Sequence, residues 1–204
     1  SSPPVAKTSQ QEKNRRVVIV GIPGVGKSTV VKKVVELMRE QDQKTEVVNY
    51  GTTMMEEATR LFGLKSRDQM RKLPVEDQRQ LQIYAARKIS RLDTPFIIID
   101  THLFIATREG FWPGMPLDVL RALDPTHLVL VWASLEEIMS RRENDTTRSR
   151  DQVNKETLEL EMDAAKTYLF ASSLVCGCPA LVVRNSTGRI EEAAQSIINS
   201  VFSN

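Results

Sequence analysis

Short apolar runs alternate along the chain with longer segments in which apolar residues recur at helical spacing. The short runs, rich in β-branched residues, predict strands at residues 17–20, 46–49, 96–100, 128–132 and 180–183. Helical spacing of apolar residues predicts helices over residues 27–42 and 190–202. Strands that alternate with helices are typical of a parallel sheet covered on both faces. The pattern therefore predicts an α/β fold with a five-stranded parallel sheet, doubly wound, in one domain.

The segment between the first predicted strand and the first predicted helix matches the phosphate-loop pattern G-x-x-x-x-G-K-[ST]. Glycines let such a loop turn its backbone N–H groups toward phosphate oxygens, and the start of the next helix adds its positive dipole end. In this pattern Lys27 reaches the β- and γ-phosphates and Ser28 binds Mg²⁺. The chain is therefore predicted to bind a nucleoside triphosphate. The predicted ATP-binding residues of this segment are Gly21, Ile22, Pro23, Gly24, Val25, Gly26, Lys27, Ser28 and Thr29.

Composition narrows the classes of protein that fit this loop. With 204 residues, 41% hydrophobic, 26% charged and a net charge of +2, the chain suits one ordinary domain and not a strongly basic nucleic-acid-binding protein. No apolar run approaches the roughly 20 residues of a membrane span, so we expect no membrane partner. Residues 1–14 lack a start methionine and the apolar core of a signal segment, and predict a disordered tail or an expression remnant.

The two cysteines, Cys176 and Cys178, form a C-x-C pair without further cysteine or a nearby histidine. Two ligands cannot complete a tetrahedral zinc site. We interpret the pair as small residues that lead into a strand. So few cysteines fit a reducing, cytoplasmic setting.

Asp100 ends the third predicted strand, where phosphate-loop proteins carry a carboxylate that orders Mg²⁺ and its waters. We therefore expect Ser28 and Asp100 to hold Mg²⁺, with Asp100 acting through water. The D-x-x-G switch of a GTPase is absent, because Thr101 and His102 follow Asp100. Asn154 begins the sequence N-K-x-T, which lacks the aspartate of a guanine-reading N-K-x-D. A GTPase is thus not indicated.

A first polar arm interrupts the alternation at about residues 52–92. Between residues 65 and 91 it carries eight basic and three acidic residues. The turn before it predicts a helix cap at Thr52. Arg71 is placed to hold a second anionic group that faces the γ-phosphate.

A second polar arm at about residues 141–151 contains four arginines, namely Arg141, Arg142, Arg148 and Arg150. A guanidinium donates paired hydrogen bonds to phosphate oxygens and keeps its charge. This short arm is therefore predicted to close over a phosphoryl group.

From Arg16 to about Val201 the chain resembles the archaeal-type adenylate kinases, which belong to the nucleoside monophosphate kinases. The resemblance implies a phosphate-loop kinase core with an NMP-binding arm at about 52–92 and a short lid at about 141–151. It also implies a homotrimer. The motifs that carry it are Val-Asn-Tyr-Gly-Thr at 48–52, Arg-Asp-Gln-Met-Arg-Lys-Leu at 67–73, Ile-Asp-Thr-His at 99–102, Pro-Gly-Met-Pro at 113–116 and Thr-Arg-Ser-Arg-Asp at 147–151.

On the acceptor side, the resemblance implies that Gly51, Thr52 and Arg71 contact AMP. Thr101 and His102 lie where the acceptor loop of the family passes the substrates, and they join the predicted AMP-binding set.

On the donor side, the resemblance implies that Arg141 lies at the base of the lid against the donor base, so that Arg141 joins the ATP-binding set. Arg148 and Arg150 match the lid arginines over the transferring phosphoryl group. With Lys27 and Arg141 they form the predicted catalytic set. The short lid has no cysteines, which excludes the zinc-bearing lid of some bacterial relatives. Residues 108–112 are bulkier than a simple turn, and no role follows for them.

The hypothesis that these features favour is an adenylate kinase, in which the γ-phosphoryl group of MgATP passes to AMP to give ADP. AMP arrives already ionised near pH 7, because the second pKa of a phosphate monoester is near 6, so the reaction needs no general base. The base of the donor stays open, since GTP, CTP or UTP could also serve.

Two alternatives remain at this stage. One is a kinase for CMP or for a hydroxyl acceptor of the shikimate or gluconate type, in which Asp100 would be the base. The other is an ATP-dependent RNA- or ribosome-maturation factor with a kinase fold. The near-neutral charge and the lack of clusters of aromatic and basic residues weigh against nucleic-acid contact.

Overall fold

The sheet at the centre of the fold is parallel and has the strand order β2-β3-β1-β6-β7. The computed structural model describes residues 14–144 and 155–202. The five-stranded α/β prediction is confirmed, with each predicted strand found at the same place or up to two residues longer. The strands are β1 (Arg15–Val20), β2 (Thr45–Asn49), β3 (Phe96–Asp100), β6 (His127–Trp132) and β7 (Ala180–Arg184).

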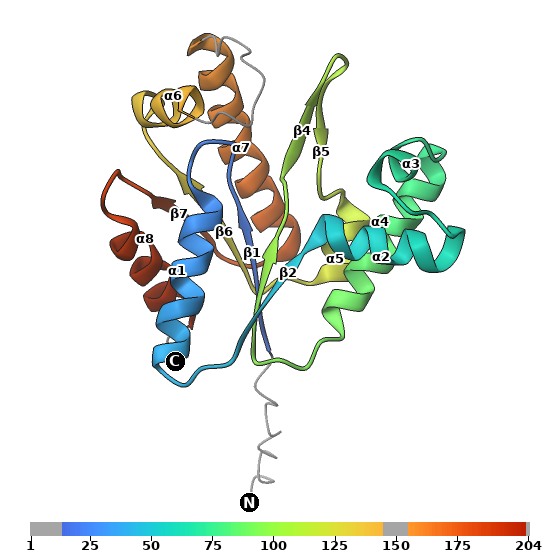
Figure 1. The fold of residues 1–204 in the computed structure, drawn as a ribbon, viewed down its shortest axis with the longest axis horizontal. Coiled ribbons are helices and arrows are strands. Elements are labelled where there is room, and N and C mark those ends of the chain that lie inside the picture. Colours follow the sequence, from blue (N-terminus) through green and yellow to red (C-terminus); the bar gives the residue numbers. More distant parts are fainter. Residues whose placement is uncertain (1–13, 145–154, 203–204) are drawn as a thin grey trace, which may run out of the picture.

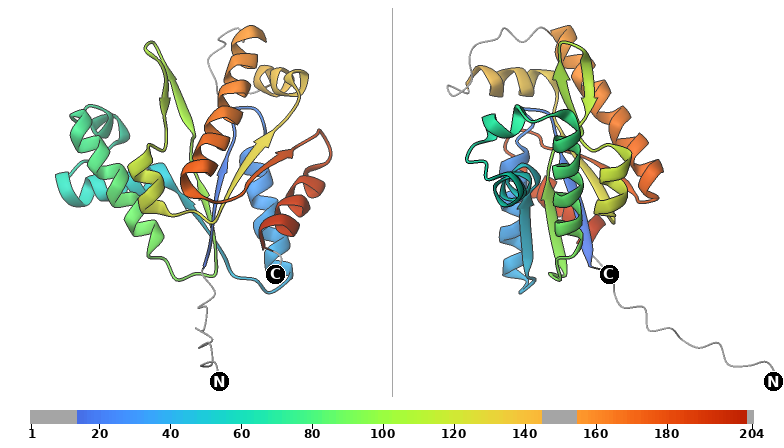
Figure 2. Two further views of the ribbon diagram at one scale, coloured as in Figure 1. Left: turned by 180° about the vertical axis from the view of Figure 1, so that it is seen from behind. Right: turned by 90° about the vertical axis from the view of Figure 1, so that its right-hand side faces the viewer.

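Helices cover both faces of this sheet (Figures 1 and 2). On one face α1 (Lys27–Glu40) packs against α8 (Ile190–Ile197), which continues as a π-helical turn, η1 (Ile198–Phe202). On the other face α7 (Lys155–Cys176) packs against β6 and against α5 (Leu117–Leu123). Central strands covered on both sides bury the side chains of both faces, as residues 16–20 of β1 and 97–99 of β3 demonstrate. The carboxyl ends of the strands are therefore the edge that is left open for chemistry.

The first arm contains three helices: α2 (Tyr50–Phe62), α3 (Arg67–Arg71) and α4 (Val75–Ser90). It has a small hydrophobic cluster of its own, in which Ala58, Met70 and Leu81 are buried. The predicted cap at Thr52 is wrong. The cap is Asn49, whose side chain accepts a hydrogen bond from the Thr52 backbone N–H at 2.9 Å, so α2 begins directly at the end of β2.

A two-stranded hairpin, β4 (Phe104–Thr107) and β5 (Gly110–Pro113), projects beyond the carboxyl ends of the sheet (Figure 1). The bulky segment 108–112, to which no role was assigned, forms its turn and most of its second strand. The hairpin packs against α7 through Tyr168. The ring of Phe104 stacks on that of Tyr168, and the Tyr168 hydroxyl donates to the Phe111 carbonyl at 3.1 Å. Only glycine fits at position 114, where an added Cβ would lie 2.1 Å from the His102 carbonyl oxygen.

The second arm begins in α6 (Leu135–Glu143), which follows β6. The remaining lid residues, including Arg148 and Arg150, lie outside the described residues, as does the predicted tail up to residue 13. Asn14 is described, and its amide donates to the Leu92 carbonyl at 3.0 Å. Cys176 ends α7 and Cys178 lies just before β7, both as half-buried free thiols. Among the described residues, no helix has the length and apolar character needed to cross a bilayer.

Candidate functional site

The phosphate loop joins the carboxyl end of β1 to the first turn of α1. Gly24 and Gly26 have φ of +95° and +80°, which other residues rarely adopt, and together they curl the backbone. Gly26 is also the N-cap of α1 and has no side chain to occupy the N–H groups of the first turn. The positive end of the α1 dipole is therefore left for an anion.

The carbonyl groups of the loop face α6 and the segment after β7. Arg142 Nε donates to the Pro23 carbonyl at 2.8 Å, and Arg141 Nη1 donates to those of Gly24 and Val25 at 3.3 and 3.2 Å. The buried amide of Asn185 donates to the Val25 carbonyl at 2.9 Å. The Val25 N–H donates to the Ile22 carbonyl at 3.4 Å. With these carbonyls bonded, the other N–H groups of the loop can be offered to phosphate oxygens.

Lys27 is held at the end of β3. Its ammonium lies 2.5 Å from Asp100 Oδ1 and donates to the Thr101 carbonyl at 3.2 Å. The contact follows from the sheet, because β3 pairs with β1 in a register that sets Asp100 opposite Ile19. Asp100 thus offsets the charge of Lys27 until an anionic ligand arrives.

Ser28 and Asp100 are the described residues that fit a magnesium ion. The Ser28 hydroxyl is exposed on the first turn of α1, and the Asp100 carboxylate lies beside the neighbouring Lys27. Both supply the hard oxygen donors that Mg²⁺ prefers, and Mg²⁺ at phosphate sites typically keeps waters and phosphate oxygens as its other ligands. In the part of the chain that the structure describes, no cluster of three or more His, Cys, Asp or Glu side chains forms a separate metal site.

A cavity of about 280 Å³ lies beside the loop, between residues 21–23, the hairpin and α7. Its walls are mostly apolar, with His102 and the ion pair of Arg142 and Glu161, 3.2 Å apart, as polar groups. Desolvation and the Lys27 ammonium lower the pKa of His102, against the opposing effect of Asp100. The loop therefore adjoins a space large enough for part of a second substrate.

The first arm brings Arg67 to the predicted acceptor residues. Its guanidinium donates to the Thr52 hydroxyl at 3.1 Å and lies 3.6 Å from where a Cβ on Gly51 would be. Arg71, the predicted acceptor arginine, is 71% exposed and instead pairs with Asp68 at 3.2 Å. Sequence reasoning missed Arg67 although it stands in the same motif, because spacing alone does not tell which arginine of the short α3 faces α2.

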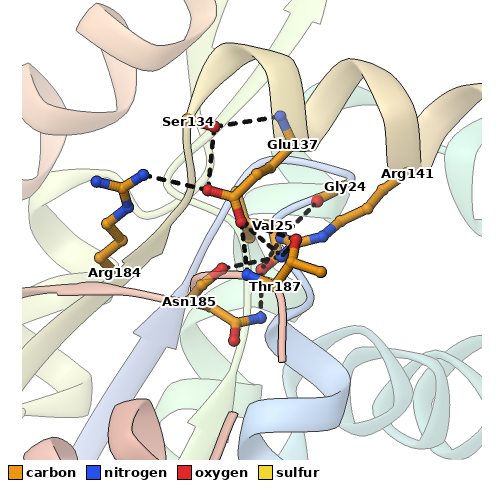
Figure 3. Close-up of polar contacts among 8 residues, drawn as sticks. All are labelled: Gly24, Val25, Ser134, Glu137, Arg141, Arg184, Asn185 and Thr187. Carbon is orange, nitrogen blue, oxygen red and sulfur yellow. Dashed lines mark hydrogen bonds and ion pairs between the residues drawn. The ribbon is translucent and has the colours of Figure 1, made fainter. Parts of the chain in front are cut away.

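A second network that sequence reasoning missed is centred on Glu137 of α6 (Figure 3). Its carboxylate accepts hydrogen bonds from the Thr187 N–H and hydroxyl at 2.6 and 2.9 Å, and from the Ser134 hydroxyl at 3.0 Å. Arg141 and Arg184 each lie 3.3 Å from it. Burial raises the pKa of this carboxyl, but the hydrogen bonds from Thr187, Ser134 and Arg184 prevail and lower it to about 2. The S-x-x-E pattern, a helix-start signature, was the signal available for Glu137.

Most predicted site residues meet at the carboxyl ends of the strands. Residues 21–29, Asp100, Thr101, His102 and Arg141 surround the loop, while Gly51 and Thr52 begin α2 at the end of β2. Arg71 is instead exposed at the surface and paired with Asp68. The arrangement can hold a polyphosphate in the loop and a second anionic group near the arm.

The sequence is similar to known nucleotide kinases over nearly its whole length. The AAA domain family matches residues 20–159. The adenylate kinase of Methanocaldococcus jannaschii is 37% identical over 187 residues, which cover 91% of this chain and 97% of that protein. The adenylate kinase of Sulfurisphaera tokodaii is 39% identical over 190 residues, with 91% and 98% covered.

Solved structures with this fold include two shikimate kinases. The enzyme from Acinetobacter baumannii in complex with shikimate has a TM-score of 0.54 at 18% identity, covering 95% of this chain and 96% of that chain. The enzyme from Bacteroides thetaiotaomicron has a TM-score of 0.57 at 12% identity, covering 93% and 99%. At these identities the likeness concerns the fold alone.

We expect Gly26→Ala to weaken binding of a nucleoside triphosphate. The added Cβ would lie 2.5 Å from Asn185 Nδ2 at a backbone φ of +80°, so Asn185 must move away from the loop. The free energy of unfolding should fall by about 2 kcal/mol. The dissociation constant for MgATP should rise by at least about tenfold, because the loop loses its shape. Urea unfolding and calorimetric titration measure the two effects.

Gly63→Ala is the matched control. Gly63 has a similar φ of +65°, but no described atom lies within 4 Å of an added Cβ. This variant should lose about 1–2 kcal/mol of stability through the backbone alone and bind MgATP normally. Equal losses of MgATP affinity in both variants would contradict the loop's dependence on Asn185.

Proposed function

Because the chain belongs to the adenylate kinase family, we propose that it transfers the γ-phosphoryl group of MgATP reversibly to AMP, giving two molecules of ADP. The observation that carries the proposal is the phosphate loop, in which Lys27 pairs with Asp100 at the carboxyl end of β3. The chain that bears this loop is similar to adenylate kinases over about nine-tenths of its length. Sequence similarity supports the family, and the loop supplies the donor site.

Lys27 is the group that meets the transferring phosphate. In the structure it is paired with Asp100 at 2.5 Å, and the β- and γ-phosphates of ATP offer a larger negative charge within reach of its flexible side chain. Lys27 would therefore exchange Asp100 for phosphate oxygens and stay with the phosphoryl group during transfer. Ser28 and Asp100 would hold Mg²⁺, which when bound neutralises charge on the β- and γ-phosphates.

The acceptor side needs charge and not a base. The phosphate of AMP is largely ionised at pH 7, since its second pKa is near 6. What it needs is a cation that draws it toward the γ-phosphate and offsets the repulsion between the two groups. We assign Arg67 and Thr52 of the first arm to the binding site for the phosphate of AMP. His102 and the cavity beside the loop would lie between the two substrates.

The hydroxyl-acceptor alternative is weakened by the environment of Asp100. A hydroxyl acceptor requires a base, whereas the Asp100 carboxylate, which lies beside Lys27 of the phosphate loop, is assigned here to Mg²⁺ together with Ser28 and not to proton transfer. The likeness to shikimate kinases extends only to the fold. A homotrimer and a cytoplasmic setting remain predictions from the family resemblance and the cysteine content.

An assay that crosses four nucleoside triphosphates with four monophosphates tests the proposed reaction. ATP with AMP should give ADP from both substrates, with AMP preferred as acceptor, and chelation of Mg²⁺ by EDTA should abolish the transfer. ADP alone should yield ATP and AMP, because the reaction is reversible. ATP hydrolysis that RNA stimulates, without conversion of AMP, would favour the maturation-factor alternative.

Arg67→Ala should raise the KM for AMP by about 10–100-fold, the usual cost of a lost charged hydrogen bond. The KM for ATP should stay within about twofold, because Arg67 belongs to the arm and not to the loop. Arg71→Ala is the comparison and should change the KM for AMP less, since Arg71 is 71% exposed. A larger effect of Arg71→Ala would mean that the arm rearranges when AMP binds and that the original assignment of Arg71 is the better one.

Arg148→Ala and Arg150→Ala should each lower kcat by about 10³-fold or more. Arginines that stabilise charge in phosphoryl transfer have effects of this size. Arg121→Ala, which changes an exposed arginine on α5, is the control and should leave kcat unchanged. Steady-state kinetics with saturating ATP and AMP measures the effect, and near-normal kcat in both lid variants would remove them from the catalytic set.

A further inference from the structure

The carboxylate of Glu137 joins three segments that are far apart in the sequence (Figure 3). Glu137 itself belongs to α6, which leads into the lid. Arg141, one helical turn later, bonds to Glu137 and also donates to the Val25 carbonyl of the phosphate loop. Thr187 and Arg184, 50 and 47 residues away, carry it to the end of β7 and the segment that follows.

Both carboxylate oxygens are fully used. Oε1 accepts from the Ser134 hydroxyl at 3.0 Å and from Arg184 Nη2 at 3.3 Å. Oε2 accepts from the Thr187 N–H and hydroxyl and from Arg141 Nη2. An amide in place of the carboxylate keeps one acceptor oxygen but sets an NH₂ group against donors on the other side. Glu137→Gln therefore removes the negative charge and one of the two acceptor oxygens with little change in side-chain volume.

Arg141 depends on this carboxylate for its orientation. Its Nη2 is shared between Glu137 at 3.3 Å and the Asn185 carbonyl at 2.9 Å, while its Nη1 reaches the Gly24 and Val25 carbonyls. The guanidinium thus lies between the loop on one side and Glu137 on the other. Asn185 bonds to both sides, because its carbonyl accepts from Arg141 and its side-chain amide donates to the Val25 carbonyl.

Helix capping accounts for only part of these contacts. The Ser134 hydroxyl accepts from the Glu137 N–H at 3.2 Å, as an N-cap does, and donates to the Glu137 carboxylate. A residue that served the helix alone would need nothing from Thr187, Arg184 or Arg141. The contacts beyond the cap all hold parts of the donor side of the loop.

We propose that Glu137 is a positioning residue for the donor nucleotide, which fixes Arg141 and residues 185–187 as one rigid unit around the phosphate loop. The inference rests on the proposed function only in taking Arg141 and the loop as the donor site. Glu137 bonds to Arg141 and Thr187 and, through Arg141, is linked to Asn185, so it would act on the nucleotide through these residues.

Charge and geometry predict opposite results for Glu137→Gln. Loss of a negative charge beside the loop would favour the polyanion ATP, so a purely electrostatic role predicts tighter binding. A positioning role predicts weaker binding, because Arg141 and Thr187 lose the acceptor that orders them. The sign of the change therefore separates the two roles.

The experiment measures ATP and AMP binding separately by calorimetric titration of the full chain at 0.15 M salt. Glu137→Gln should raise the dissociation constant for ATP by at least about tenfold and change that for AMP by less than about twofold. Unaltered AMP binding shows in the same experiment that the variant is folded. Because neither titration requires turnover, the result stands apart from the activity assay that tests the proposed reaction.

Two controls change the same helix end without removing the acceptor. Glu136→Gln removes an exposed charge one residue away, and Ser134→Ala removes the cap but leaves the contacts to Thr187 and Arg141. Both should keep ATP affinity within about 1.5-fold. Tighter ATP binding by Glu137→Gln, or a loss in Ser134→Ala as large as in Glu137→Gln, would overturn the proposal.

Thr187→Val serves as a second variant with a milder change. It removes the hydroxyl that donates to Glu137 at 2.9 Å and keeps the backbone N–H that donates at 2.6 Å. We expect ATP to bind about threefold more weakly to it and AMP normally. If Glu137→Gln fails to fold, this variant decides, and unchanged ATP affinity in Thr187→Val would then overturn the proposal.

Discussion

A phosphate loop can offer its N–H groups to an anion only if its carbonyl groups find donors elsewhere. In this chain the carbonyls of residues 23–25 accept hydrogen bonds from Arg141, Arg142 and Asn185. These donors come from α6 and from the segment after β7, more than 100 residues along the chain from the loop. The loop is therefore shaped by its surroundings as much as by its own glycines, and the helix that leads into the lid is fastened to the donor site.

The charges around the loop are balanced before any nucleotide binds. Lys27 pairs with Asp100, Arg142 with Glu161, and Arg141 with Glu137. Arg141 and Arg142 also bond to carbonyls of the loop, whereas Lys27 bonds to Asp100 and the Thr101 carbonyl at the end of β3 and has a long flexible stem that can change partners. This difference suits the proposed function, in which the arginines would hold the shape of the site and the lysine would follow the phosphoryl group.

The fold alone does not tell which acceptor a kinase of this kind takes. The sheet order and the loop suit any phosphate-loop kinase, and shikimate kinases share the fold at low identity. The helical arm, in which Arg67 bonds to Thr52, and the hairpin lie in segments between strands of the sheet, and the cavity lies beside residues 21–23. Fold and acceptor are therefore separate questions, and the acceptor has to be argued from these local features.

Local patterns determined the strands, the loop and the pair Lys27 and Asp100, because apolar runs mark buried parallel strands and residues that follow such strands meet at one edge of the sheet. Thr101 and His102 came from the family resemblance. The tertiary structure decided what depends on distant partners. Asn185 and Glu137 became parts of the loop's support only through packing of α6 and β7. The short α3 sets Arg67 against Thr52 of α2, a choice between two arginines of one motif that spacing cannot make. The hairpin was missed since its strands are short and partly exposed, and they are held by stacking on α7 that no local pattern encodes.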